Sequence, residues 1–96
     1  MNLTALTPPQ RSILFLTTPS LWPHWPFLPL VRRSVGEPDL GILYDFRHSS
    51  GRTGFSSTVF ITNLFLIPAS EKALLELPRE VFDTAEEVVA AGWNVD

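Results

Sequence analysis

The ten residues from Thr58 to Ile67 constrain the fold of this chain more than any other stretch. They form its longest uncharged run of β-branched and aromatic residues, the types that pack well on a pleated sheet. Both alternating sets are largely apolar, with Val59, Ile61 and Phe65 on one side and Phe60 and Leu64 on the other. The run therefore predicts a strand that is covered on both faces, or covered on one face and paired with a partner on the other. Asn63 is expected to make cross-strand or loop hydrogen bonds.

Two further stretches have strand character. Residues 40–46 alternate Ile42, Tyr44 and Phe46 with less apolar neighbours, which suits one buried face. A polar loop at 47–54 follows, so residues 40–46 and about 57–66 are expected to form an antiparallel hairpin. Residues 30–33 are expected to form a short edge strand that starts after Pro29.

Helix signals flank these strands. Thr7 followed by Pro8 is typical of an N-cap and first helical position, and the helix would end before Pro19 with Ile13 and Leu14 on its inner face. A strand over 13–16 is the competing interpretation, because short apolar runs are ambiguous.

The second half of the chain carries its own helix signals. Ser70 would cap a short helix over 71–76 that Pro78 ends. Asp83 or Thr84 would cap the last helix, and Thr84 with Glu87 matches a capping box. Gly92 is the expected residue beyond that helix. Trp93 would then fold back onto the core.

These elements predict an α+β fold within one domain over 1–96. Its small antiparallel sheet has about three strands, with an N-terminal helix and a capped C-terminal helix, in the order α-β-β-β-α. The chain has 96 residues, 45% hydrophobic and only 18% charged, and no cysteine. Disulfides and thiolate-ligated zinc are excluded, and we expect a cytoplasmic protein.

The uncharged run from Ser12 to Val31 raises the question of a membrane or export segment. Its four prolines would break a spanning helix, and no basic region or small-residue cleavage site surrounds it. Three of the prolines recur every third residue, the period of polyproline II, and Trp22, Trp25 and Leu28 recur with them. This ridge would either pack on the core of the protein or bind an aromatic-lined groove of a partner.

The candidate ligand site combines the 47–54 loop with a basic pair. Arg47, His48 and Arg52 lie in the loop, and Arg32 and Arg33 would join them if strand 30–33 pairs beside 40–46. Guanidinium and hydroxyl groups suit an anion, and tryptophans near arginines suit single-stranded nucleic acid. The alternatives are a solvated loop and ion pairs with Asp39, Asp45 or the acidic C-terminal half.

The sequence offers little for catalysis or metal binding. His24 and His48 are its only histidines and have no paired spacing for zinc. A triad of Asp45, His48 and Ser49 or Ser50 would crowd neighbouring residues of one loop, without a nucleophile-elbow pattern. We therefore expect no enzyme, no cofactor and no metal.

Charge and composition point to a binding role. The segment 1–54 carries five arginines against three acids, and the segment 55–96 carries two basic side chains against seven acids. The net charge of −3 argues against a dedicated nucleic-acid binder. The leading hypothesis is a small non-enzymatic protein–protein interaction module, with a second copy of the chain among its expected partners. The second hypothesis is anion, nucleotide or single-stranded nucleic-acid binding through loop 47–54, Arg32 and Arg33.

Overall fold

The computed structural model describes residues 6–45 and 57–96. Their secondary structure runs α1 (Pro8–Thr17), η2 (Pro19–Leu21), β1 (Phe27–Arg32), β2 (Asp39–Tyr44), β3 (Thr58–Phe60), η4 (Leu64–Leu66), α2 (Glu71–Leu75), β4 (Arg79–Val81), α3 (Ala85–Ala90) and β5 (Trp93–Val95). The strands form one antiparallel sheet in the order β4-β3-β2-β1-β5. The α+β class is confirmed, but the sheet has five strands rather than about three.

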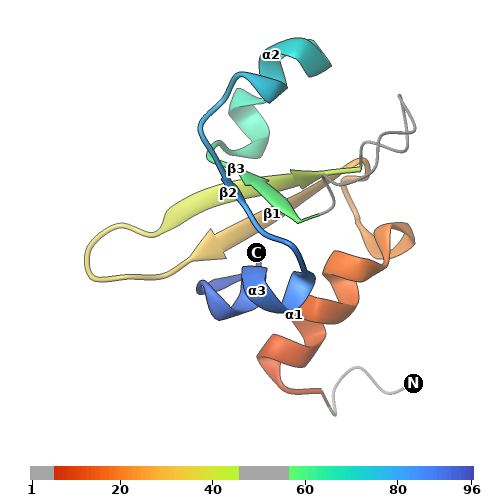
Figure 1. The fold of residues 1–96 in the computed structure, drawn as a ribbon, viewed down its shortest axis with the longest axis vertical. Helices are drawn as coiled ribbons and strands as arrows, with labels where there is room; N and C mark the ends of the chain where they lie inside the picture. Colours follow the sequence, from red (N-terminus) through yellow and green to blue (C-terminus); the bar gives the residue numbers. More distant parts are fainter. Residues whose placement is uncertain (1–5, 46–56) are drawn as a thin grey trace.

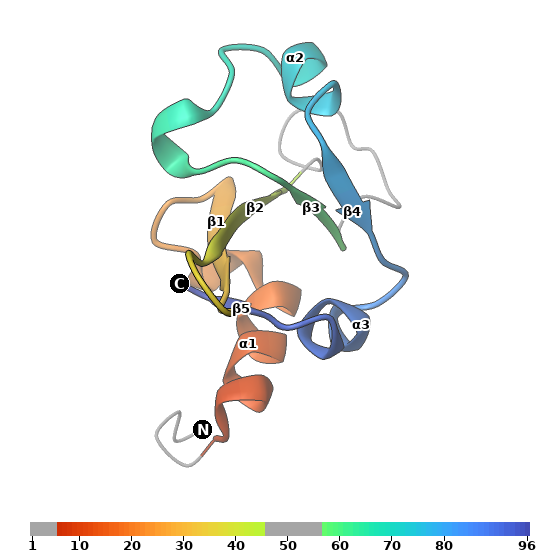
Figure 2. The same cartoon turned by 90° about the vertical axis from the view of Figure 1, so that its left-hand side faces the viewer.

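The two faces of this sheet are covered by different elements (Figures 1 and 2). The first face lies against α1 and α3, and its buried residues include Leu28, Leu43 and Trp93. The second face packs Ile42 and Phe60 against Leu74 of α2 and its neighbours. The sheet thus separates two apolar clusters.

The helix caps form as the sequence predicts. The Thr7 hydroxyl accepts a hydrogen bond from the Gln10 amide, and the Gln10 side chain accepts one from the Thr7 amide. Ser70 and Thr84 accept from Ala73 and Glu87 in the same way. The helix over residues 8–17 settles the ambiguity of the 13–16 run, because a satisfied N-cap and a proline at the first position favour the helix.

The inner face of α1 differs from the prediction. Ser12 and Leu16 are the buried residues, whereas Ile13 and Leu14 are only partly covered. The Ser12 hydroxyl donates to Asn94 Oδ1 and accepts from the Val95 amide. A polar residue therefore fixes the contact between α1 and β5, which a search for apolar periodicity overlooks.

The long strand expected over 57–66 is wrong in length. Pairing of β2 with β3 is antiparallel, as expected, and both Val59 and Phe60 are fully buried. The strand ends at Phe60, however, and the chain turns into η4. The Asn63 side chain accepts a hydrogen bond from the Phe65 amide. In this turn a side-chain hydrogen bond therefore takes the place of the backbone hydrogen bonds between strands.

Residues 22–29 also depart from the prediction. Residues 22–26 form turns instead of a polyproline II connector, and residues 27–29 already belong to β1. The turns contain a cis bond between Trp25 and Pro26 and a hydrogen bond from the Phe27 amide to the His24 carbonyl. Strand β1 starts at Phe27, before Pro29, and lies between β2 and β5. It is therefore not the edge strand that the sequence suggested.

Candidate functional site

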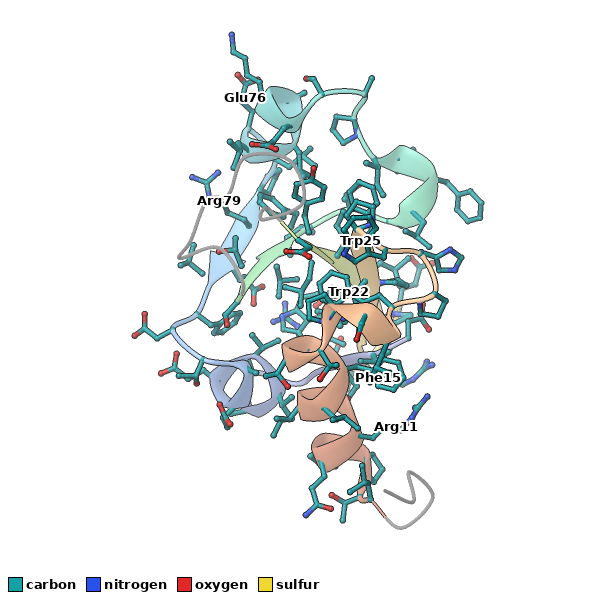
Figure 3. All side chains as sticks on the ribbon, turned by 90° about the vertical axis from the view of Figure 1, so that its right-hand side faces the viewer. Arg11, Phe15, Trp22, Trp25, Glu76 and Arg79 are labelled. Atoms are coloured by element: carbon teal, nitrogen blue, oxygen red, sulfur yellow. The ribbon has the colours of Figure 1, made fainter. Side chains whose placement is uncertain are left out.

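Trp22, a residue of the predicted tryptophan ridge, belongs to the core. It is buried among the residues of the first cluster, and its indole N–H donates to the Phe15 carbonyl over 2.6 Å. Figure 3 shows it above α1, near Phe15. Its buried position favours the alternative in which this part of the ridge packs on the core of the protein.

Trp25 lies at the surface, with 47% of its area exposed. Its indole N–H donates to Asp45 Oδ2 over 3.0 Å. The ring is therefore held at the end of β2 while part of its surface faces solvent. The expected pairing of tryptophans into one apolar ridge does not occur, because Trp22 and Trp25 have different surroundings.

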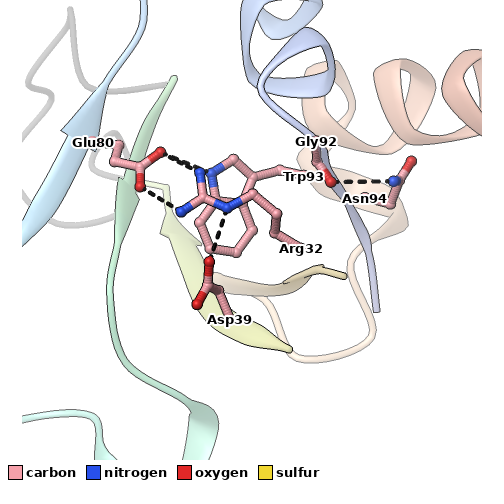
Figure 4. A network of polar contacts seen from close by, with 6 residues as sticks. All are labelled: Arg32, Asp39, Glu80, Gly92, Trp93 and Asn94. Atoms are coloured by element: carbon pink, nitrogen blue, oxygen red, sulfur yellow. Dashed lines mark hydrogen bonds and ion pairs between the residues drawn. The ribbon is translucent and has the colours of Figure 1, made fainter. Parts of the chain in front are cut away.

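Arg32 is the centre of a polar network across the first face (Figure 4). Its two terminal nitrogens donate to the two carboxylate oxygens of Glu80 over 2.8 Å each, and Nε donates to Asp39 over 3.0 Å. The guanidinium carbon lies 4.4 Å from the ring centroid of Trp93. The Trp93 indole N–H also donates to Glu80 over 3.2 Å.

The network shifts the pKa values of Glu80 and Arg32. Hydrogen bonds from Arg32 are the largest influence that lowers the pKa of Glu80 below its ordinary value, and those to Glu80 raise the pKa of Arg32. The network joins β1, β2, β4 and β5, so an arginine of the basic half meets acids of both halves. Arg32 therefore has a structural role here, and its guanidinium is engaged by the protein itself.

The rest of the predicted anion site is not assembled within the described residues. Arg33 follows β1 and is exposed. Arg47, His48 and Arg52 lie outside the described ranges. Ser49 and Ser50 lie outside them too, so Asp45 is the one described member of the predicted triad. In residues 6–45 and 57–96, no group of three or more histidine or acidic side chains could hold a metal ion.

A groove that the sequence did not reveal lies between η4 and strands β1 and β2. Its volume is about 430 Å³, and Pro29, Leu40 and Leu64 contribute apolar walls. A Cβ built on Gly41 would point at Val59 and Trp93 on the first face of the sheet. Neighbouring residues of a strand alternate between faces, so Leu40 lies on the second face. His24 and Asp96 are the titratable residues of the described lining.

Apolar side chains project beside this groove. Phe65 is 97% exposed and Leu66 is 67% exposed, and both belong to η4. The Phe65 amide donates to Asn63 Oδ1 over 2.9 Å, and the Leu66 amide donates to the Asn63 carbonyl over 3.0 Å. The turn that Asn63 caps therefore directs the two side chains into solvent.

The groove and η4 together, with Leu40 and Ile61 also partly exposed, make the best candidate site in the described residues. An exposed apolar patch of this kind marks interaction surfaces in soluble proteins. A single signal in the sequence could have suggested it. Asn63 interrupts an apolar run, and a side chain that competes for backbone hydrogen bonds favours a turn there.

None of the helices described over residues 6–45 and 57–96 has the length and apolar character to cross a bilayer. Comparison of the chain with protein-family models, with curated proteins and with solved structures gives no match.

Proposed function

We propose that this chain is a small non-enzymatic protein-interaction module that buries η4 and the adjoining groove against an apolar surface of another polypeptide. The observation that carries the proposal is the 97% exposure of Phe65 beside a groove of about 430 Å³. Phe65 makes no contribution to the two apolar clusters of the chain. Its position is consistent with a contact made outside the monomer.

The energetics favour such burial. Covering an exposed phenylalanine or leucine side chain contributes roughly 1.5–3 kcal/mol, so Phe65 and Leu66 together would give a substantial part of an interface. Aromatic anchors at the centre of a contact supply most of the binding energy in many complexes. The groove offers apolar walls for side chains of the partner, so both surfaces would lose contact with water.

The second hypothesis, anion or nucleic-acid binding, has less support. Arg32 would have to leave Glu80, Asp39 and Trp93 to bind a phosphate. Binding through Arg33, Arg47 and Arg52 remains a prediction from the sequence. A salt titration with a single-stranded oligonucleotide tests it, since phosphate-driven affinity falls steeply as salt rises.

A light-activated cross-linking residue tests the proposed surface. A benzophenone amino acid at position 65 is expected to give protein adducts on irradiation in the native cell extract. The same residue at Glu86, which is exposed on α3 at the other side of the sheet, is the matched control and should give few. Equal adduct yields at the two positions, or none at position 65, would refute the proposal.

A further inference from the structure

We infer that the polypeptide that covers this surface is a second copy of the same chain, with Phe65 of each copy inserted into the groove of the other about a two-fold axis. The inference rests on the proposed function, because it uses the same surface. It adds the identity of the partner and the geometry of the contact.

An exposed aromatic side chain and a groove lie next to each other on one surface of the chain. A two-fold contact is isologous, so residue i of one copy meets residue j of the other and the reverse also holds. A surface can satisfy this only if it is complementary to itself. Here Phe65 projects from η4, and the groove lies beside it between η4, β1 and β2.

The Phe65 side chain does not fill the groove of its own chain. Phe65 contributes to the wall of the groove and yet is 97% exposed, so its ring is not packed against its own chain. The Asn63 cap and the hydrogen bond from the Leu66 amide hold the turn in this conformation. A ring supplied by another copy is not constrained in this way and can enter the groove.

Size and polarity of the groove suit an aromatic ring. Its volume is about 430 Å³, within the range of cavities that enclose small organic groups. Leu40 on its floor is 40% exposed and would lose contact with water on docking. Pro29 and Leu64 supply further apolar contact, so ring and groove would be desolvated together.

Charge does not oppose the arrangement. The acids of α2 and α3 are absent from the described lining of the groove, and its titratable residues are His24 and Asp96. The net charge of −3 per copy gives a long-range repulsion that physiological salt largely screens. Two copies can therefore approach at this surface without placing clusters of like charge together.

A pair of complementary charge variants tests the reciprocal contact. The variants are Phe65→Lys, which alters the projection, and Leu40→Glu, which alters the groove. Each variant alone would place a charge against an apolar surface at both contacts of its own dimer. A mixture of the two would form one native contact and one Lys–Glu contact, so only the mixed dimer should form.

Light scattering after size exclusion measures the result. The unmodified chain should have twice the monomer mass of 10.8 kDa. Each variant should run as a monomer at the same concentration, with self-association weakened at least about tenfold, and the equimolar mixture should recover the dimer mass. A monomeric unmodified chain at millimolar concentration, variants that still dimerise, or a mixture that stays monomeric would each overturn the inference.

Two controls separate folding from association. Val81→Lys changes a residue on β4 that is 66% exposed, close to the 67% of Leu66 beside Phe65, and should leave the dimer intact; its loss would overturn the inference. Should Leu40→Glu fail to fold by circular dichroism, Leu40→Lys mixed with Phe65→Glu replaces it. If position 65 cross-links to a different protein while the chain is a monomer, the proposed function stands and this inference falls.

Discussion

The two faces of the sheet use their apolar residues differently. On the first face, Leu28, Val59 and Trp93 have almost no exposed area, and α1 and α3 cover them. On the second face, Ile42 and Phe60 are equally buried, but the chain beside them leaves Phe65 in solvent. The apolar residues of the first face are buried by the chain itself, whereas apolar side chains beside the second face are exposed to solvent.

The lengths of the covering elements explain the difference. Helix α1 has ten residues and α2 has five, and the three residues of η4 add a single turn. Since an α-helix rises by a fixed amount per residue, α2 covers about half the length that α1 covers. The short elements cover the end of the second face near Tyr44 and Phe60, and the groove opens where their cover stops.

The largest expected effect is at the completed face. Trp93→Ala should lower the free energy of unfolding by about 3–5 kcal/mol, as for other buried large-to-small changes, because Trp93 is fully buried. Urea denaturation followed by circular dichroism measures this. A loss below about 1 kcal/mol would mean that the first face is no better packed than the second.

The next effect tests how closely the first face is filled. Gly41→Ala places a Cβ 2.6 Å from Val59 Cγ1 and 3.1 Å from the Trp93 ring, so core side chains must move. Overpacking of this kind costs about 1–3 kcal/mol, measurable as a lower urea midpoint. Leu40→Ala, the neighbouring position on the second face, is the control and should cost less. Equal losses would contradict the comparison.

A smaller effect depends on pH. The pKa of Glu80 is lowered in the folded state chiefly by hydrogen bonds from Arg32, so its carboxylate stabilises the fold at neutral pH. That contribution should begin to fade near pH 4.5, the ordinary value, and be lost as pH falls through the folded pKa. Glu80→Gln should therefore cost about 1 kcal/mol at neutral pH and less in acid below the ordinary value. A difference that is constant with pH would contradict this role.

The smallest effect on folding belongs to the open face. Phe65→Ser should change the unfolding free energy of the monomer by less than about 0.5 kcal/mol, as for other exposed positions, because Phe65 is almost fully exposed. Thermal and urea unfolding at concentrations where the chain is monomeric measure it. A large loss would show that Phe65 supports the fold, and the contrast between the two faces would disappear.

Local signals in the sequence predict the helices well. The Thr7, Ser70 and Thr84 caps depend on side chains three residues from their partners, so the chemistry is visible in a short window. Trp93 lies in the core, as the sequence predicts. These features need no knowledge of the rest of the chain.

Strands with distant partners escape such prediction. Strands β4 and β5 have three residues each, and their register depends on pairs such as Phe60 with Arg79 and Arg32 with Trp93. No local pattern specifies such short strands, since their stability comes from cross-strand contacts. The groove was missed for a related reason, because it exists only where η4 folds back over β1 and β2.

The contact of Ser12 with β5 has a consequence for the solubility of the sheet. The Asp96 amide donates a hydrogen bond to the Pro29 carbonyl on β1, so the Val95 amide points away from β1. This outward amide donates a hydrogen bond to the Ser12 hydroxyl. Open strand edges act as templates for edge-to-edge aggregation. Within the described part of the chain, helix α1 protects the β5 edge against pairing with a strand of another molecule. The opposite edge of the sheet is β4, where the backbone groups of Arg79 and Val81 point outward and could pair with such a strand.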